Sequence, residues 1–198
     1  AAVFLKTLTA TYLNLKHNIK IPAEEGVLDV NAPYDPAELE DSYKKYANFS
    51  KLKSRAEEMA YQVSGTVEPM GVLNVITGQI PLDKLMAKAK EHNATLTEYL
   101  VAVYIYSIYK DHVLESEKRK RPIKISVPIN MRRFYPSITT RNFSLFVNVG
   151  IDPAFGEYTF EEIIKQVHHF MRLEIDAKKL NAQMAKNVSS EKMFIVRV

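Results

Sequence analysis

Hydrogen-bond donors gather where two expected strands of the chain meet. Asn130 and Arg132 follow the first strand, and Arg141 and Asn142 precede or open the second. Donors without neighbouring acceptors suit a carbonyl, an oxyanion or a phosphate. The residue types alone leave a second interpretation equally open, in which the arginines are solvated and the asparagines cap the connecting loop.

Other chemistries lack the residues that they need. The chain has no cysteine, which excludes disulfides, thiolate nucleophiles and sulfur-based zinc sites. Its six glycines do not form a phosphate-binding or dinucleotide-binding loop, and no Gly-x-Ser-x-Gly motif occurs. His168 and His169 are adjacent, so on a helix they diverge by about 100° and cannot hold one metal ion together. We therefore expect no metal site and no permanently bound cofactor.

Composition and charge are those of an ordinary globular protein. The 198 residues are 46% hydrophobic and carry a formal net charge of +4. A basic run at 118–121 follows Glu115 and Glu117 and lacks interleaved aromatic residues, which favours a solvated turn over a nucleic-acid site. No apolar run reaches the roughly 20 residues that cross a bilayer, and the first residues do not resemble a signal peptide. We expect a cytoplasmic protein with no membrane span.

The positions of apolar residues and prolines divide the chain into three segments. Residues 1–17 follow a helical period, whereas prolines interrupt the period in 18–70, which is interpreted as a linker or crossover with a weak helix at 35–45. Residues 71–198 alternate between strand and helix patterns. Both termini lie inside apolar segments and no initiator methionine is present, so we expect a piece of a longer protein.

Within 71–198 the patterns predict a layered α/β fold, an α+β sandwich with helices packed on a sheet. Capping boxes at Thr95–Glu98 and Thr159–Glu162 predict helices that end near residues 111 and 180, the first of them apolar on nearly all sides and buried. Pro81 suits the first turn of another helix. The expected strands cover residues 72–78, 122–128, 142–151 and 191–198.

The donor-rich segment also carries a family pattern. A strand ends in Val-Pro-x-Asn-x-Arg, a loop contains Tyr-Pro-Ser, and Arg-Asn-Phe opens the next strand; the residues are Val127, Pro128, Asn130, Arg132, Tyr135, Pro136, Ser137, Arg141, Asn142 and Phe143. This pattern resembles the condensation-domain and chloramphenicol-acetyltransferase-like acyltransferases, most closely their bacterial alcohol acetyltransferase-like branch. Segments 79–85 and 93–100 extend the resemblance, which covers about residues 71–170.

The resemblance implies a CoA-dependent acyltransferase-like C-terminal subdomain with a mixed sheet. It implies transfer of an acyl group, acetyl above all, from CoA to an alcohol or amine. The family's general-base histidine stands in a His-x-x-x-Asp-Gly motif that this chain lacks. Residues 1–17 resemble the helix that follows this motif, so we expect the histidine just before Ala1, in the missing N-terminal subdomain, and no catalytic residue in this chain.

The same resemblance places Arg141 and Asn142 first among residues that face a substrate tunnel, followed by Ser137, Asn130 and Arg132. Two alternatives remain open. One is a condensation domain that uses acyl-carrier thioesters as co-substrates, and the other is a non-catalytic interaction module with the same fold. A His-x-x-x-Asp-Gly motif directly upstream of Ala1 would favour an enzyme, and this piece by itself is expected to be inactive.

Overall fold

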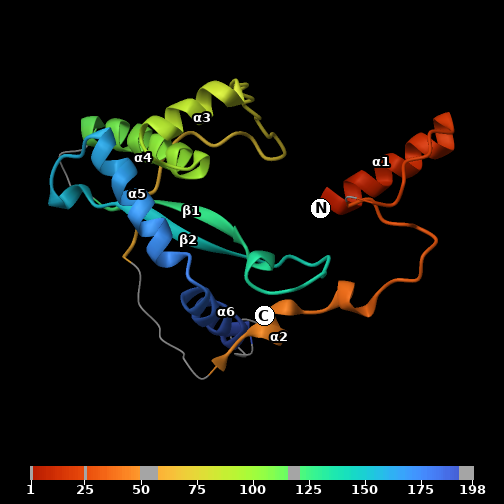
Figure 1. Cartoon of the computed structure of the whole chain (residues 1–198). Coiled ribbons are helices and arrows are strands. Elements are labelled where there is room, and N and C mark those ends of the chain that lie inside the picture. Colours follow the sequence, from red (N-terminus) through yellow and green to blue (C-terminus); the bar gives the residue numbers. More distant parts are fainter. Residues whose placement is uncertain (1, 25, 50–57, 116–120, 192–198) are drawn as a thin grey trace. The chain divides into compact units, whose positions relative to one another are not determined.

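The computed structural model describes residues 2–24, 26–49, 58–115 and 121–191 of the chain (Figure 1). These residues form two compact units, 1–40 and 41–198. The expected strand at 192–198 and most of the basic run at 118–121 lie outside the described residues. The boundaries predicted at residues 17 and 70 stay predictions.

The first unit is built on α1 (Ala2–His17), which confirms the helix predicted there. The helix ends as Asn18 takes a positive φ of 53°. Downstream, the Leu28 backbone N–H donates to Thr7 Oγ1 at 2.9 Å, so the following chain folds back along the helix. Ala10 is buried, whereas Phe4 and Leu15 are exposed.

An antiparallel hairpin forms the sheet of the second unit. Strands β1 (Ile123–Asn130) and β2 (Ser144–Ile151) pair from Ile123 opposite Ile151 to Asn130 opposite Ser144. Residues opposite each other share a face. The face that contains Val127, Ile129, Leu145, Val147 and Val149 is buried.

Helices cover this apolar face of the hairpin. Helix α4 (Leu96–Glu115) packs on β1, α5 (Phe160–Glu174) packs on α4 and β2, and α6 (Ala177–Glu191) contacts β2 (Figure 1). Helix α3 (Leu82–Glu91) packs on α4, and the short α2 (Ser42–Tyr46) packs on α6. The layered α/β prediction is confirmed at this level, and the described sheet has two antiparallel strands.

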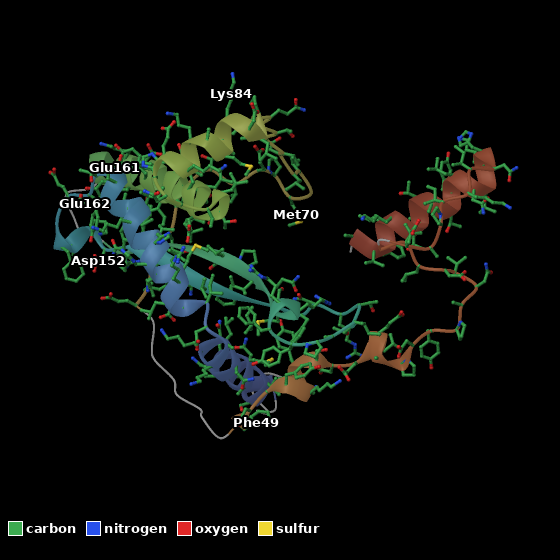
Figure 2. The ribbon with its side chains drawn as sticks, viewed as in Figure 1. Phe49, Met70, Lys84, Asp152, Glu161 and Glu162 are labelled. Carbon is green, nitrogen blue, oxygen red and sulfur yellow. The ribbon has the colours of Figure 1, made fainter. Side chains whose placement is uncertain are left out.

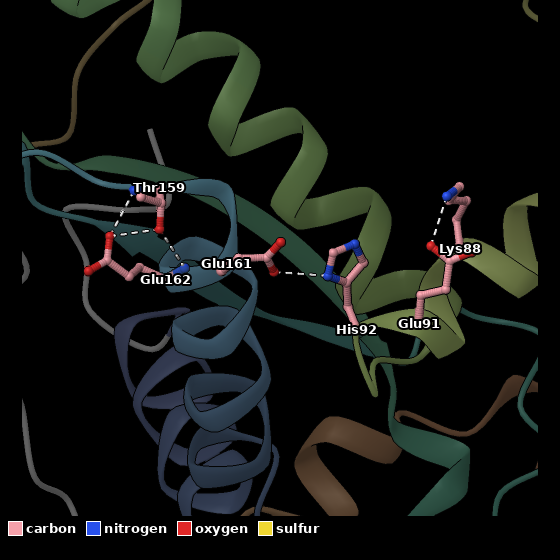
Figure 3. A network of polar contacts seen from close by, with 6 residues as sticks. All are labelled: Lys88, Glu91, His92, Thr159, Glu161 and Glu162. Carbon is pink, nitrogen blue, oxygen red and sulfur yellow. Dashed lines mark hydrogen bonds and ion pairs between the residues drawn. The ribbon is translucent and has the colours of Figure 1, made fainter.

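Both predicted capping boxes are present. The Thr95 N–H donates to Glu98 Oε2 at 2.7 Å, and the Glu98 N–H donates to Thr95 Oγ1 at 3.3 Å. Thr159 and Glu162 make the same reciprocal pair at the start of α5 (Figure 3). Each pair satisfies backbone donors that an uncapped helix leaves unpaired.

A side-chain contact links the C-terminal end of α3 to the first turn of α5. His92 follows the last residue of α3, and its Nδ1 lies 2.9 Å from Glu161 Oε2 in the first turn of α5 (Figure 3). The His92 ring also stacks on Tyr99 and meets Phe160 edge-on. The His92 backbone N–H thus closes the end of α3, while its imidazole anchors that end to α4 and α5.

Three predictions for these segments need correction. The single helix expected from 160 to 180 is broken between α5 and α6, because Asp176 Oδ1 accepts hydrogen bonds from the N–H groups of Lys178 and Lys179 and starts a new helix. Glu191, expected in a strand, is the last residue of α6. Helix α4 has an exposed side, since Leu100 and Tyr104 are 43% and 59% exposed.

The strand expected at 72–78 is also wrong. No residue of this segment belongs to a strand, and Leu73 and Ile76 are 85% and 98% exposed. Met70, labelled on the same stretch in Figure 2, is fully exposed. A strand forms only where a neighbour accepts and donates its backbone hydrogen bonds, and no described residue pairs with this segment.

The predicted weak helix at 35–45 is split into a 3₁₀ helix, η1 (Pro36–Leu39), and α2. Among the described residues, no helix is long and apolar enough to cross a bilayer. Within the same residues, no cluster of histidine, aspartate and glutamate could hold a metal ion.

Candidate functional site

The five residues singled out from the sequence lie at one end of the hairpin. Asn130 ends β1, and the other four belong to residues 131–143, which we call the site loop. The hairpin register sets Asn130 opposite Ser144, so the loop starts and ends at the same place. The backbone N–H of Met131 donates to the Phe143 carbonyl at 3.1 Å and closes the neck of this loop.

Arg132 stabilises the site loop from within. Its Nη2 donates to the carbonyl oxygens of Thr139 and, at 2.9 Å, of Arg141. A planar guanidinium with several donors suits this bridging of two carbonyls. Arg132 is exposed, but its guanidinium is engaged by two carbonyls of the loop and is therefore not a wholly free donor.

The two asparagines cap the ends of the loop. Asn130 Oδ1 accepts from the Arg132 N–H at 3.1 Å and starts the 3₁₀ helix η3 (Met131–Arg133), while Asn142 Oδ1 accepts from Ser144 Oγ at 2.7 Å. These contacts match the capping interpretation of the sequence. Both residues are exposed, and their amide NH₂ groups make no hydrogen bond with any described residue, so each keeps two donors.

Ser137 lies between the loop and α2. Its Oγ accepts from the Thr139 N–H at 3.2 Å and lies 2.7 Å from Ser42 Oγ. Ser42 and Thr139 are 2% and 3% exposed, so water cannot replace these contacts easily. Ser137 is half-buried and is positioned by both neighbours.

Arg141 differs from Arg132 because its guanidinium donates no hydrogen bond to any described residue and is exposed. Its backbone N–H donates to Thr139 Oγ1 at 3.3 Å. The nearby Asp41 is influenced by the Arg141 charge. Burial opposes ionisation of Asp41, but hydrogen bonds and charge from Lys44 outweigh it and lower the Asp41 pKa. Arg141 is thus a cation on a fixed backbone, open to a ligand.

Two tyrosines of α2 hold the site loop and were missed from the sequence. The Tyr43 hydroxyl accepts from the Ser144 N–H at 3.1 Å and donates to the Ser144 carbonyl. The Tyr46 hydroxyl donates to the Pro136 carbonyl. Tyrosines three positions apart share one face of a helix, and that spacing is the signal that could have marked them.

Aromatic packing supports these contacts. Phe143 is 1% exposed and meets the Tyr43 ring edge-on at 5.3 Å, while Tyr46 lies 4.9 Å from the Tyr135 ring. Burial raises the pKa of Tyr43 above its ordinary value, against the opposing effects of the Ser144 backbone and of Arg132. The Tyr43 hydroxyl therefore remains protonated and remains a donor at neutral pH.

Helix α6 fixes α2 from the other side. Asn181 Nδ2 donates to the Tyr46 carbonyl and to the Tyr135 hydroxyl, both at 2.8 Å. Its Oδ1 accepts from the Asn48 N–H at 2.9 Å. One asparagine therefore joins α6, α2 and the site loop.

A pocket of about 470 Å³ lies farther along the hairpin. Ser126 and Asn148 form part of its wall and are hydrogen-bonded at 2.7 Å, and Tyr61, Tyr104 and Lys124 line it as well. Ser126 is four residues before Asn130 on the same face of β1, a rise of about 13 Å. The pocket wall takes residues from both faces of β1, Ser126 from one and Ile125 from the other, so it is not confined to the polar face.

The arrangement can hold a negative or partly negative oxygen but cannot by itself remove a proton. The end of β1 offers the Asn130 amide and the site loop offers the Arg141 guanidinium and the Asn142 amide, whose N–H groups are all donors. No histidine or cysteine occurs between residues 121 and 151. The proton acceptor of an acyl transfer would have to come from elsewhere.

Comparison with known proteins identifies the family. No curated protein and no solved structure matches the chain. The model of the alcohol acetyltransferase family matches residues 36–187, which include α2, both strands, the site loop and most of α6. The match covers most of the 198 residues. The chain therefore belongs to the alcohol acetyltransferase family.

Proposed function

We propose that the protein to which this chain belongs transfers an acyl group, acetyl above all, from a CoA thioester to the hydroxyl of an alcohol. The match to alcohol acetyltransferases over residues 36–187 is the observation that carries this proposal. The site loop supports it, because the Arg141 guanidinium, which donates to no described residue, stands on a backbone held by Arg132 and Thr139. A cytoplasmic location, where acyl-CoA is made and used, is part of the same proposal.

The reaction we propose is direct transfer without a covalent enzyme intermediate. The acceptor oxygen attacks the thioester carbonyl, and its proton passes to a histidine in the part of the protein upstream of Ala1. A tetrahedral oxyanion forms. When it collapses, the carbon–sulfur bond breaks and the sulfur takes up the proton, which leaves an ester and free CoA.

The residues of this chain would act by binding and orientation. Arg141 and the Asn142 amide would donate to the thioester carbonyl or to the acyl donor's polar groups, where a developing negative charge strengthens each bond. Ser137 would line the same region. Asn130 would offer its free NH₂ group from the end of β1, and Arg132 would keep the loop in shape.

The wider architecture is proposed on the same basis. The second unit would be the C-terminal subdomain of a CoA-dependent acyltransferase with a mixed sheet larger than the described hairpin, and α1 would belong to an N-terminal subdomain. An amine acceptor, a carrier-protein thioester and a non-catalytic role have less support, because the matching family is named for transfer to alcohols.

The test is release of free thiol from acetyl-CoA by the full-length protein with a panel of alcohols. Arg141→Ala should lower kcat/KM about tenfold to a hundredfold, with an unchanged melting temperature, since the Arg141 side chain makes no hydrogen bond with the described residues. Arg133→Ala is the matched control, because Arg133 is another exposed arginine of the site loop that has no proposed contact with substrate. Equal activity of the Arg141 variant at equal fold would contradict the role of Arg141, and no release with any alcohol would contradict the function.

A further inference from the structure

We propose that α2 is the positioning element of the site loop, and that the hydroxyl groups of Tyr43 and Tyr46 set the conformation from which Ser137 and Arg141 meet the substrate. The catalytic part of this inference rests on the proposed function. The conformational part stands on contacts within the second unit.

The two tyrosines hold the loop on both sides of its central residues. Tyr46 binds the carbonyl of Pro136, directly before Ser137, and Tyr43 binds both backbone polar groups of Ser144, three residues after Arg141. The stretch 137–141 therefore lies between two fixed points. Each tyrosine binds backbone groups, Tyr46 within the loop and Tyr43 at the first residue of β2, so both act on the path of the chain itself.

A third contact comes from the residue next to Tyr43. Ser42 Oγ lies 2.7 Å from Ser137 Oγ, and the Ser42 side chain is buried. Asp41, which precedes it, carries a charge that interacts with Arg141. Three consecutive residues of the chain thus face the loop, each through a different kind of interaction.

Helix α2 is too short to be stable alone, because a helix of five residues barely exceeds its nucleus. Its position depends on α6, through the bonds from Asn181 to Tyr46 and through Lys44 Nζ, which lies 3.3 Å from Glu191 carboxylate oxygens. Helix α6 therefore holds α2 in place, and α2 in turn holds the site loop.

Removal of a tyrosine hydroxyl leaves loop backbone groups without a partner and widens the range of loop conformations. Small displacements of groups that position a reacting carbonyl lower the rate of the chemical step. The effect should therefore fall on kcat, while KM for the alcohol and for acetyl-CoA changes little.

The experiment uses the full-length protein and the variants Tyr43→Phe and Tyr46→Phe. Tyr34→Phe is the matched control, because Tyr34 is 69% exposed and lies in the first unit. Amide hydrogen exchange is measured over residues 136–144, and kcat and KM are measured with acetyl-CoA and an alcohol. We expect exchange at Ser144 to be about tenfold faster in Tyr43→Phe, faster exchange near 137–139 in Tyr46→Phe, and kcat about tenfold lower in both.

The two readouts separate this inference from the proposed function. Exchange over 136–144 that matches the control in both tyrosine variants would overturn the inference whatever the activity. Faster exchange with unchanged kcat would also overturn it, since α2 would then be structural only. If the wild-type protein releases no thiol with any alcohol, the proposed function fails, whereas faster exchange would still support the control of the loop by α2.

Discussion

Strand β1 and the segment 71–78 have similar amino-acid patterns but different structures. Both are rich in isoleucine and valine, and the sequence predicts a strand for each. In β1, Ile123 is 1% exposed and every residue is paired with β2. In the other segment, Ile76 is 98% exposed, and no described residue pairs with it.

The difference lies in what surrounds each segment. β1 has a partner strand that its own hairpin loop brings alongside, and α4 and α5 cover the apolar face of the hairpin. The segment 71–78 is followed by α3, which packs on α4 and leaves the segment uncovered. A segment with high β-propensity therefore forms a strand only where it has both a partner strand and a covering layer.

The largest expected effect on stability comes from replacing one glycine of each region with valine. A Cβ at Gly150 would lie 1.9 Å from the backbone oxygen of Ile123, whereas a Cβ at Gly78 would meet nothing within 4 Å. We expect Gly150→Val to lower the free energy of unfolding by more than about 4 kcal/mol, because backbone atoms of the paired strand cannot move aside. Urea unfolding of the full-length protein measures the change.

Gly78→Val serves as the control and should change the free energy of unfolding by less than about 0.5 kcal/mol. A large loss of stability in the Gly78 variant would show that the segment 71–78 is packed after all. Equal, small effects at both glycines would contradict the close approach of β1 and β2 at Gly150.

A smaller effect is expected when one isoleucine of each segment is truncated. Ile123→Ala should cost about 3 kcal/mol, because the removed atoms leave a cavity between the hairpin and its helices. Ile76→Ala removes an exposed side chain and should change stability by less than about 0.5 kcal/mol. Paired urea titrations measure the two values, and similar losses for both variants would remove the contrast between the segments.

The hairpin and the helix starts could be predicted from the sequence because their signals are local. Alternating apolar residues mark both strands, and the capping boxes place Thr95 and Thr159 correctly. The break at Asp176 was missed because the apolar period continues past it to Leu180, which is buried in the next helix. Asp176 itself indicated the start of a new helix, since aspartate is a common N-cap residue.

The candidate site was predictable only in part. The donors of residues 130–142 could be found from their types, and the closing of the hairpin brings them to one loop. The support from α2 could not be found, because Tyr43 and Ser144 are 101 positions apart in the chain. Their contact depends on α6 and on the path of residues between them, and no local pattern specifies such long-range contacts.

The smallest expected effect on stability concerns the carboxylates of the two capping boxes, Glu98 at the start of α4 and Glu162 at the start of α5. Glu98 is 4% exposed, and His168 Nδ1 of α5 lies 3.3 Å from its Oε2; Glu162 is exposed. Burial opposes ionisation of Glu98, but its hydrogen bonds with Thr95 and its contact with His168 outweigh burial and lower its pKa below the ordinary value of a glutamate. The Glu162 pKa is also lowered, by its hydrogen bonds with Thr159.

A carboxylate with a lowered pKa in the folded state stabilises the fold above its unfolded pKa, and the stabilisation is lost as the pH falls through the folded pKa. Glu98→Gln should therefore lower the free energy of unfolding by about 1 kcal/mol at neutral pH, and its difference from the wild type should shrink in acid. Glu162→Gln should show a smaller difference, because water surrounds its carboxylate and screens the contacts. Urea unfolding at about pH 7 and about pH 3.5 measures both. A difference for Glu98→Gln that grows in acid would contradict the sign, and equal effects at neutral pH would mean that burial beside α5 adds nothing to this cap.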